Sequence, residues 1–144
     1  MPREEVIVLV RKVFGTGGPR TREQALREVA QALGYARLGS SIRKTLETDL
    51  LTAVKRGILE NDRGHLRLLA RSLADYDRNF LKQQFLAAIG RGWVEREEAI
   101  YRWVRWMGYG RTTEGMFDVG RSLINGLLRT GGLETEGRER VRRV

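Results

Sequence analysis

The sequence predicts a mainly α-helical protein with small β-hairpins, built from two copies of one unit. Apolar residues recur at helical spacing over most of the chain, and in two places a strand–turn–strand pattern follows the helices. Residues 34–67 also return 74 residues later without a gap. An ungapped match that keeps a turn and a helix stop at one spacing indicates a duplicated unit. The matching pairs are Arg22 and Arg96, Glu23 and Glu97, Ala25 and Ala99, Gly34 and Gly108, Tyr35 and Tyr109, Arg37 and Arg111, Gly57 and Gly131, Leu59 and Leu133, and Glu60 and Glu134.

Composition indicates a globular and strongly basic protein. The 144 residues are enough for one ordinary domain or two very small ones, and 41% of them are hydrophobic. A formal charge of +9 is typical of proteins that bind a polyanion, nucleic acid first and acidic lipid second. The alternative is an Arg-rich surface of the kind found in heat-adapted or GC-rich organisms, without such a partner.

The chain contains no Cys, which excludes disulfides, a thiolate nucleophile and a zinc finger. An apolar run at residues 6–10 is interrupted at once by Arg11 and Lys12, so it is too short for a signal peptide or a membrane span. We therefore expect a cytoplasmic protein that makes no membrane contact.

The first two helices are predicted from apolar periodicity and capping residues. A helix over residues 4–14 is followed by a glycine-rich loop at residues 15–19, which lacks the Gly-Lys-Ser/Thr of a phosphate loop. Thr21 and Gln24 form a capping box that begins the second helix. Gly34 ends it, because glycine readily adopts the left-handed conformation.

A third helix is predicted to begin near Gly39 or Ser40, with Ser40 or Ser41 as its cap, and to end at Gly57. Residues 58–60, 61–64 and 65–68 read as strand, turn and strand. The buried stripe of this third helix is predicted to contain Ile42, Leu46, Leu50, Ala53 and Val54, with Leu51 at its edge. Three helices followed by a hairpin describe a winged-helix (helix-turn-helix) unit, in which the third helix is the candidate recognition helix.

The second unit repeats this plan. The connection over residues 70–79 contains neither Gly nor Pro, and its apolar spacing predicts helix starting at Ser72 or near Asp77. The second hairpin is predicted at residues 133–144, with its turn at residues 135–137. The predicted fold is thus a tandem of winged-helix units, 1–70 and 71–144, with the second packed against the first.

The turn Gly34-Tyr35-x-Arg37-x-Gly39-Ser40-x-Ile42-Arg43, followed by Val54-Lys55-Arg56-Gly57-x-Leu59, also carries a family resemblance. The first unit, over roughly residues 20–68, resembles the C-terminal helical module of large bacterial superfamily I DNA helicases. This resemblance implies a bacterial, DNA-handling context. It does not imply helicase activity, because no ATP-binding motif is present.

The start of the third helix and the hairpin supply candidate DNA contacts in the first unit. A helix in the major groove presents its first turns to base edges, while its flanks and the wing contact phosphates. The candidate residues are Arg37, Ser40, Ser41, Arg43, Lys44, Arg63, His65 and Arg67. The alternative is a solvated cationic face without a ligand.

The second unit is a weaker candidate. Its third helix begins with Glu114 and carries Asp118, and both carboxylates would repel phosphates. Residues 1–72 have a net charge of +6 and residues 73–144 a net charge of +3. Its hairpin could still hold a phosphate track, since the alternating residues Arg138, Arg140 and Arg142 are expected on one strand face.

Three further features keep alternative interpretations open. Arg37 and Arg111 would clamp phosphates, or would cap carbonyls at the end of the preceding helix. Trp93 and Trp106 would form a contact to a protein partner, to a second copy or between the units, or would stack on bases. The lone His65 and the absence of Cys predict neither a metal site nor a cofactor.

The resulting hypothesis is a non-catalytic protein that binds double-stranded DNA, chiefly through its first unit. The alternative hypothesis is a winged-helix adaptor that binds acidic proteins and does not contact DNA. This adaptor would expose an apolar patch around Trp93 and Trp106. A nuclease or another enzyme is disfavoured, because no cluster of metal ligands or nucleophile is apparent.

Overall fold

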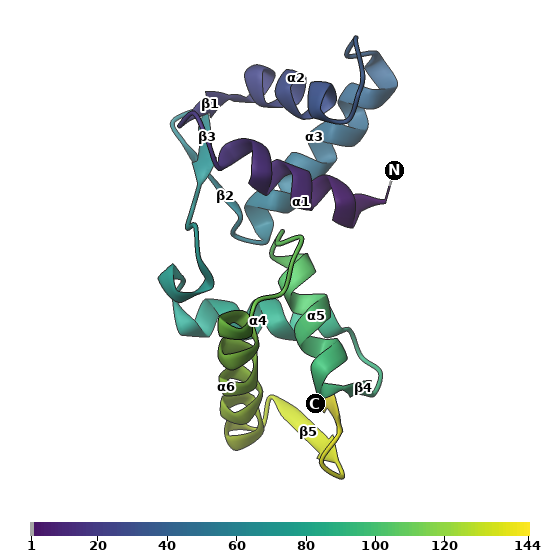
Figure 1. The fold of residues 1–144 in the computed structure, drawn as a ribbon, viewed down its shortest axis with the longest axis vertical. Helices are drawn as coiled ribbons and strands as arrows, with labels where there is room; N and C mark the ends of the chain where they lie inside the picture. Colours follow the sequence, from purple (N-terminus) through teal and green to yellow (C-terminus); the bar gives the residue numbers. More distant parts are fainter. Residues whose placement is uncertain (1) are drawn as a thin grey trace. The chain divides into compact units, whose positions relative to one another are not determined.

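The computed structural model describes residues 2–144. These residues fold into two compact units, Met1–Arg71 and Ser72–Val144 (Figure 1). Each unit is mainly helical and contains one small antiparallel sheet, which confirms the coarse fold class. The expected fixed packing of one unit against the other stays a prediction.

In unit 1, a short strand lies between the first two helices, and a hairpin follows the third helix. Its sheet has the order β1-β3-β2, and β1 pairs with β3 through Arg20↔Leu66 and Thr21↔His65. The hairpin was predicted, but β1 was not, because two residues carry no strand periodicity. The elements are α1 (Arg3–Phe14), β1 (Arg20–Thr21), α2 (Arg22–Ala32), α3 (Ser40–Lys55), β2 (Leu59–Asp62) and β3 (His65–Leu68).

Local signals place most of the helix ends in unit 1. The capping box is confirmed: the Gln24 amide donates to Thr21 Oγ1 at 3.2 Å, and the Thr21 amide donates to Gln24 Oε1 at 2.9 Å. Gly34 follows α2 with a φ of 93°, as its role as a helix stop requires. The prediction of a serine cap for α3 is wrong, since Gly39 is the N-cap and no side chain caps the helix.

The first hairpin turns over two residues. Arg63 and Gly64 have φ values of 55° and 87°, the left-handed geometry of a tight hairpin turn. Asn61 and Asp62, predicted in the turn, instead belong to β2. Asn61 still supports the turn, because its Oδ1 accepts from the Gly64 amide at 3.0 Å.

An arginine missed by the sequence analysis organises the loop between α1 and β1. Arg20 is nearly buried, and its guanidinium donates to the carbonyls of Val13, Thr16 and Gly18 and pairs with Glu28. The loop carbonyls therefore have a protein partner in place of water.

The core of unit 1 lies between the three helices and the sheet. The predicted apolar stripes of α1 and α2 are buried, and Leu46, Leu50 and Ala53 line the core side of α3. Ile42 and Val54 pack against its edge. One charged residue, Asp49, lies in this stripe and is also buried.

Unit 2 repeats the order of elements and the sheet order, here β4-β6-β5. The spacing of 74 residues is kept by the starts of α2 and α5, of α3 and α6, and of β2 and β5. The second hairpin is one residue longer, so its turn covers residues 137–139 and not the predicted 135–137. The elements are η1 (Leu73–Asp75), α4 (Arg78–Ile89), β4 (Val94–Glu95), α5 (Arg96–Trp106), α6 (Glu114–Thr130), β5 (Leu133–Glu136) and β6 (Arg140–Arg143).

Of the two alternative starts predicted for the helix before residue 89, the one near Asp77 is confirmed for α4, and Ser72 begins only a three-residue 3-10 turn. Ser72 precedes η1 and forms a capping box with Asp75, and Asp77 caps α4 by accepting from the Phe80 amide at 3.1 Å.

None of the helices in residues 2–144 is long and apolar enough to cross a membrane.

The core of unit 2 accommodates larger side chains than that of unit 1. Trp103 is fully buried and its ring lies 5.7 Å from that of Phe85. At the position of Leu46 in unit 1, α6 has Gly120, and Ile100 fills the adjacent space. A Cβ atom at residue 120 would lie 2.8 Å from Ile100 Cγ1, so the glycine is required by packing.

We expect Gly120→Ala to destabilise unit 2 by about 1 kcal/mol, because overpacking of about 1–3 kcal/mol outweighs a helix-propensity gain of about 1 kcal/mol. Gly115→Ala is the matched control in the same helix. A Cβ atom there would meet only Thr113 Oγ1 at 3.9 Å, so this variant should gain about 0.5–1 kcal/mol. Urea denaturation of both variants tests the prediction, and equal stabilisation would contradict it.

Candidate nucleic-acid interface

The outward face of α3 is the feature that best fits a polyanion. Its exposed residues recur every three or four positions, which places them on one side of the helix. They form the α3 outward face: Ser40, Ser41, Lys44, Thr45, Thr48, Leu51 and Lys55. The face contains two lysines and no carboxylate.

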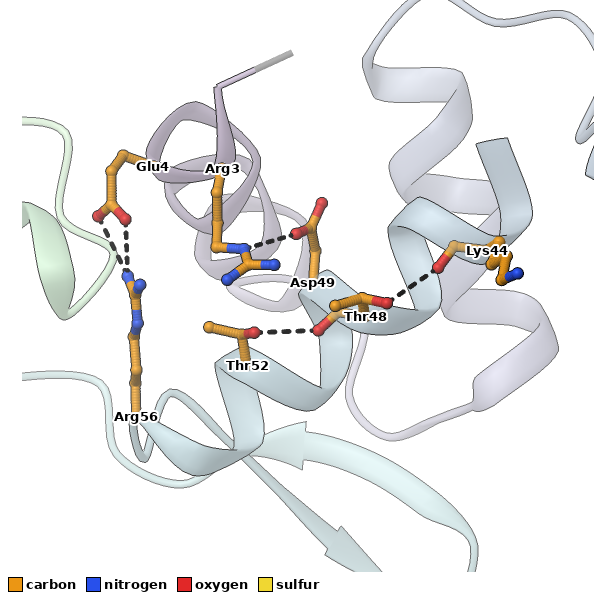
Figure 2. Close-up of polar contacts among 7 residues, drawn as sticks. All are labelled: Arg3, Glu4, Lys44, Thr48, Asp49, Thr52 and Arg56. Carbon is orange, nitrogen blue, oxygen red and sulfur yellow. Dashed lines mark hydrogen bonds and ion pairs between the residues drawn. The ribbon is translucent and has the colours of Figure 1, made fainter. Parts of the chain in front are cut away.

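The two carboxylates of α3 are held away from this face by arginines of other helices. Asp49 is 3% exposed and accepts from Arg3 Nε of α1 at 3.2 Å (Figure 2). Glu47 is half-buried and pairs with Arg22 of α2 at 3.2 Å. The sequence contained a signal for the buried carboxylate, because Asp49 lies three residues after Leu46 and four before Ala53 in the apolar stripe.

Burial raises the pKa of Asp49, and the hydrogen bond and charge of Arg3 oppose this shift. The ionised carboxylate is therefore less favourable in the folded protein than in water. The ion pair with Arg3, a half-exposed residue of the neighbouring helix α1, partly compensates the buried Asp49 carboxylate.

The charge of Arg43 is also balanced by a carboxylate of the same unit, that of Glu23. Its two terminal nitrogens donate to the two oxygens of Glu23, each at 2.7 Å, and Glu47 lies 3.9 Å away. The Arg43 hydrogen bond lowers the pKa of Glu23, so the pair stays ionised at neutral pH. Arg43, expected at the DNA surface, thus links α3 to α2.

The N-terminus of α3 is open to an anion. Gly39 supplies no capping side chain and the first turn has no acidic residue, so no side chain of the helix covers its free amides. The equivalent end of α6 is closed: Thr113 accepts from the Met116 amide at 3.3 Å, and Glu114 occupies the first turn. Asp118, which replaces Lys44, is exposed and pairs with Arg121 at 2.8 Å.

The first hairpin presents only part of its predicted charge. Arg63 at the turn and His65 on β3 are exposed. Arg67 pairs with Glu60 at 2.5 Å and lies 3.8 Å from Asp62, so its charge is balanced within the hairpin.

Arg37 precedes α3 and is exposed, as is Arg111 in unit 2. The alternative that both cap the preceding helix is not seen, since neither donates to a carbonyl in the part of the chain that the structure describes. Arg37 is therefore available to a ligand beside the open end of α3.

The arginines of the second hairpin do not form the predicted row. Arg138 lies in the turn and not on the strand, so it does not alternate with Arg140 and Arg142. Arg142 pairs with Glu134 and its guanidinium stacks over the ring of Trp93 at 4.4 Å. Arg140 lies 3.7 Å from Glu136.

The two tryptophans expected at a protein contact are engaged within unit 2. Trp93 is half-buried and lies under Arg142. Trp106 donates from Nε1 to Gln84 Oε1 at 2.9 Å and packs against the core. The exposed apolar patch predicted for the adaptor is absent from this region of the described chain.

Comparison of the chain with protein-family models, curated proteins and solved structures gives no match. Within residues 2–144, no group of three His, Cys, Asp or Glu side chains is placed to hold a metal ion.

We expect the free energy of unfolding of Asp49→Asn at pH 7 to equal that of the parent or to exceed it, by up to about 1 kcal/mol. A raised pKa means that the ionised carboxylate opposes folding above that pKa, and the opposition disappears as the pH falls through it. The difference between variant and parent should therefore shrink as the pH falls through the raised pKa of Asp49, and it should vanish below the ordinary value of about 3.9.

Denaturation across pH 3–8 measures this difference. Asp62→Asn is the control, since Asp62 is more than half exposed and should show little change. A variant that is less stable at neutral pH and equal to the parent in acid would show that the ion pair with Arg3 dominates.

Proposed function

We propose that this protein binds double-stranded DNA without catalysing a reaction, and that each of its units is a winged helix. In this proposal α3 lies in the major groove, the turn of the β2–β3 hairpin acts as a wing on the flanking backbone, and unit 1 makes most of the contacts. The element order α-β-α-α-β-β and the three-stranded sheet of each unit support this interpretation.

One observation carries the proposal: the α3 outward face is cationic and free of carboxylates, next to an uncapped helix end. Backbone amides at a helix N-terminus bind phosphate, and nearby Lys and Arg side chains add the charge that dominates affinity for DNA. The resemblance of residues 20–68 to a helicase module favours the same context.

The proposed contacts are narrower than those the sequence suggested. Arg43 and Arg67 are left out, because each is balanced by carboxylates of its own unit. The contacts proposed for unit 1 are Arg37, Ser40, Ser41, Lys44, Arg63 and His65.

Unit 2 has a secondary role in this proposal. Glu114 and Asp118 at the start of α6 would repel phosphates, so α6 is not proposed as a recognition helix. Arg138, exposed at the hairpin turn, is its best-placed candidate for a phosphate contact.

Lys44→Ala should lower the salt dependence of duplex binding by about one unit in the slope of log K against log salt, because one phosphate contact is lost. Lys12→Ala is the matched control, since Lys12 is an exposed lysine on α1, the helix that packs against α3. It removes the same charge from the same unit and should leave the slope unchanged.

Fluorescence anisotropy with a labelled duplex at several salt concentrations gives these slopes. If the parent binds no duplex, the DNA-binding proposal is wrong. If the parent binds but Lys44→Ala behaves like it, Lys44 does not contact phosphate and the proposed role of α3 is wrong.

Glu23→Gln should strengthen duplex binding and steepen the salt slope, because it releases Arg43 beside the start of α3. Glu5→Gln is the control: Glu5 is exposed on α1, and its replacement removes one negative charge without releasing an arginine from a bidentate pair. The same titration compares the two. Equal effects of both substitutions would mean that only net charge matters and that Arg43 does not reach the DNA.

A further inference from the structure

The centre of the α3 outward face is rich in methyl groups. Thr45, Thr48 and Leu51 lie between Lys44 and Lys55, and Leu51 is 56% exposed. Leu51 lies on the solvent side of a 16-residue amphipathic helix, opposite the buried Leu46 and Ala53, and its side chain is available to a ligand.

The threonine hydroxyls on this side of α3 donate to the helix itself. Thr45 Oγ1 donates to the Ser41 carbonyl at 3.2 Å, and Thr48 Oγ1 donates to the Lys44 carbonyl at 3.1 Å. Thr52 repeats the pattern with the Thr48 carbonyl at 3.0 Å, and Figure 2 shows the last two bonds in series along the helix. With their protons used in this way, these side chains offer an external ligand mainly their methyl groups.

The middle of this face lacks the side chains that usually read bases by paired hydrogen bonds. Between Lys44 and Lys55 the face contains no Arg, Asn or Gln, which read guanine and adenine, and no Asp or Glu, which accept from cytosine; the lysines can read guanine, but only at the two ends. Apolar contact with the C5-methyl group of a pyrimidine is therefore the contact that suits the middle of the face, because this methyl group projects into the major groove.

We infer that α3 recognises C5-methylated pyrimidines in the major groove, through the methyl groups of Thr45 and Thr48 and the side chain of Leu51. Lys44 and Lys55 at either end of this segment would hold the flanking phosphates. The inference rests on the proposed function and deepens it. Thymine and 5-methylcytosine both present this group, and they are distinguished by experiment.

The first experiment compares duplexes that differ only in the methyl group. The full chain is titrated with an alternating A·T duplex, the same duplex with deoxyuridine in place of thymidine, an alternating G·C duplex, and the same duplex with 5-methylcytosine. Each methyl group contacted should contribute about fourfold in affinity, the value of one buried methylene.

The expected result is that the thymine duplex binds at least about fourfold more tightly than its uracil counterpart. A gain of similar size from 5-methylcytosine over cytosine would show that the methyl group is recognised on either base. A gain with thymine alone would identify thymine as the ligand, and a gain with 5-methylcytosine alone would identify the methylated base.

A double variant tests whether the preference for methylated duplexes depends on α3. The double variant Thr45→Ser and Thr48→Ser keeps both hydroxyls and removes both methyl groups, so its ratio of affinities for methylated and unmethylated duplexes should fall toward one. Thr130→Ser in α6 is the matched control, because Thr130 is exposed and its hydroxyl donates to the Gly126 carbonyl at 3.0 Å in the same way.

Equal binding of methylated and unmethylated duplexes by the parent would overturn this inference and leave DNA binding in place. A ratio that is unchanged in the double variant would also overturn it, since the methyl groups of Thr45 and Thr48 would then contribute nothing to recognition. Failure to bind any of the four duplexes would overturn the proposed function, and the inference with it.

Discussion

Arginine–carboxylate pairing is the interaction on which the surface of unit 1 depends. In the described part of this unit, every carboxylate except that of Glu5 has an arginine partner: Glu4, Glu23, Glu28, Glu47, Asp49, Glu60 and Asp62. Several of these pairs join different elements: Arg3 of α1 pairs with Asp49 of α3, and Glu4 of α1 pairs with Arg56 at the C-cap of α3 (Figure 2). The pairs orient α3 and also neutralise the negative charge that would oppose a polyanion.

A division of roles between basic residues follows from this pairing. Arginine has a planar, multidentate head group that suits bonds to carboxylates and carbonyls, whereas lysine acts as a mobile point charge. Arg20, Arg43 and Arg56 accordingly hold loops and helices together, and Lys44 projects from α3 with no ion pair to any of residues 2–144. A count of basic residues therefore overstates the charge available to a ligand, and the acid-free face of α3 is the more informative measure.

Apolar periodicity, capping residues and turn glycines were sufficient to predict the helices, the hairpins and the duplication. They could not predict interactions between elements: Arg43 and Glu23 are 20 residues apart, and Arg3 and Asp49 are 46 apart. Neither pair leaves a mark in a local pattern, so Arg43 was expected at the DNA surface. Strand β1 was missed for the same reason, because its two residues are ordered by pairing with β3. The predicted site thus included Arg43 and Arg67, whose charges are balanced by carboxylates of their own unit, and the contact of α3 with DNA stays a prediction.

The two units show how a duplicated fold can support different surfaces. Residues that face the core are coupled. Ile100 fills the space that a side chain at residue 120 would need, so α6 has Gly120 there. At the equivalent position of α3, Leu46 packs in the core of unit 1. Positions that face solvent have no such constraint: Lys44 corresponds to Asp118, Ser40 to Glu114 and Leu51 to Asn125, while the helices keep a spacing of 74 residues. An open, basic helix end and a capped, acidic one are therefore compatible with the same backbone. This independence of the outer face from the core would allow unit 1 to contact a polyanion, as we propose, while unit 2, with its Thr113 cap and acidic first turn, would not compete for it.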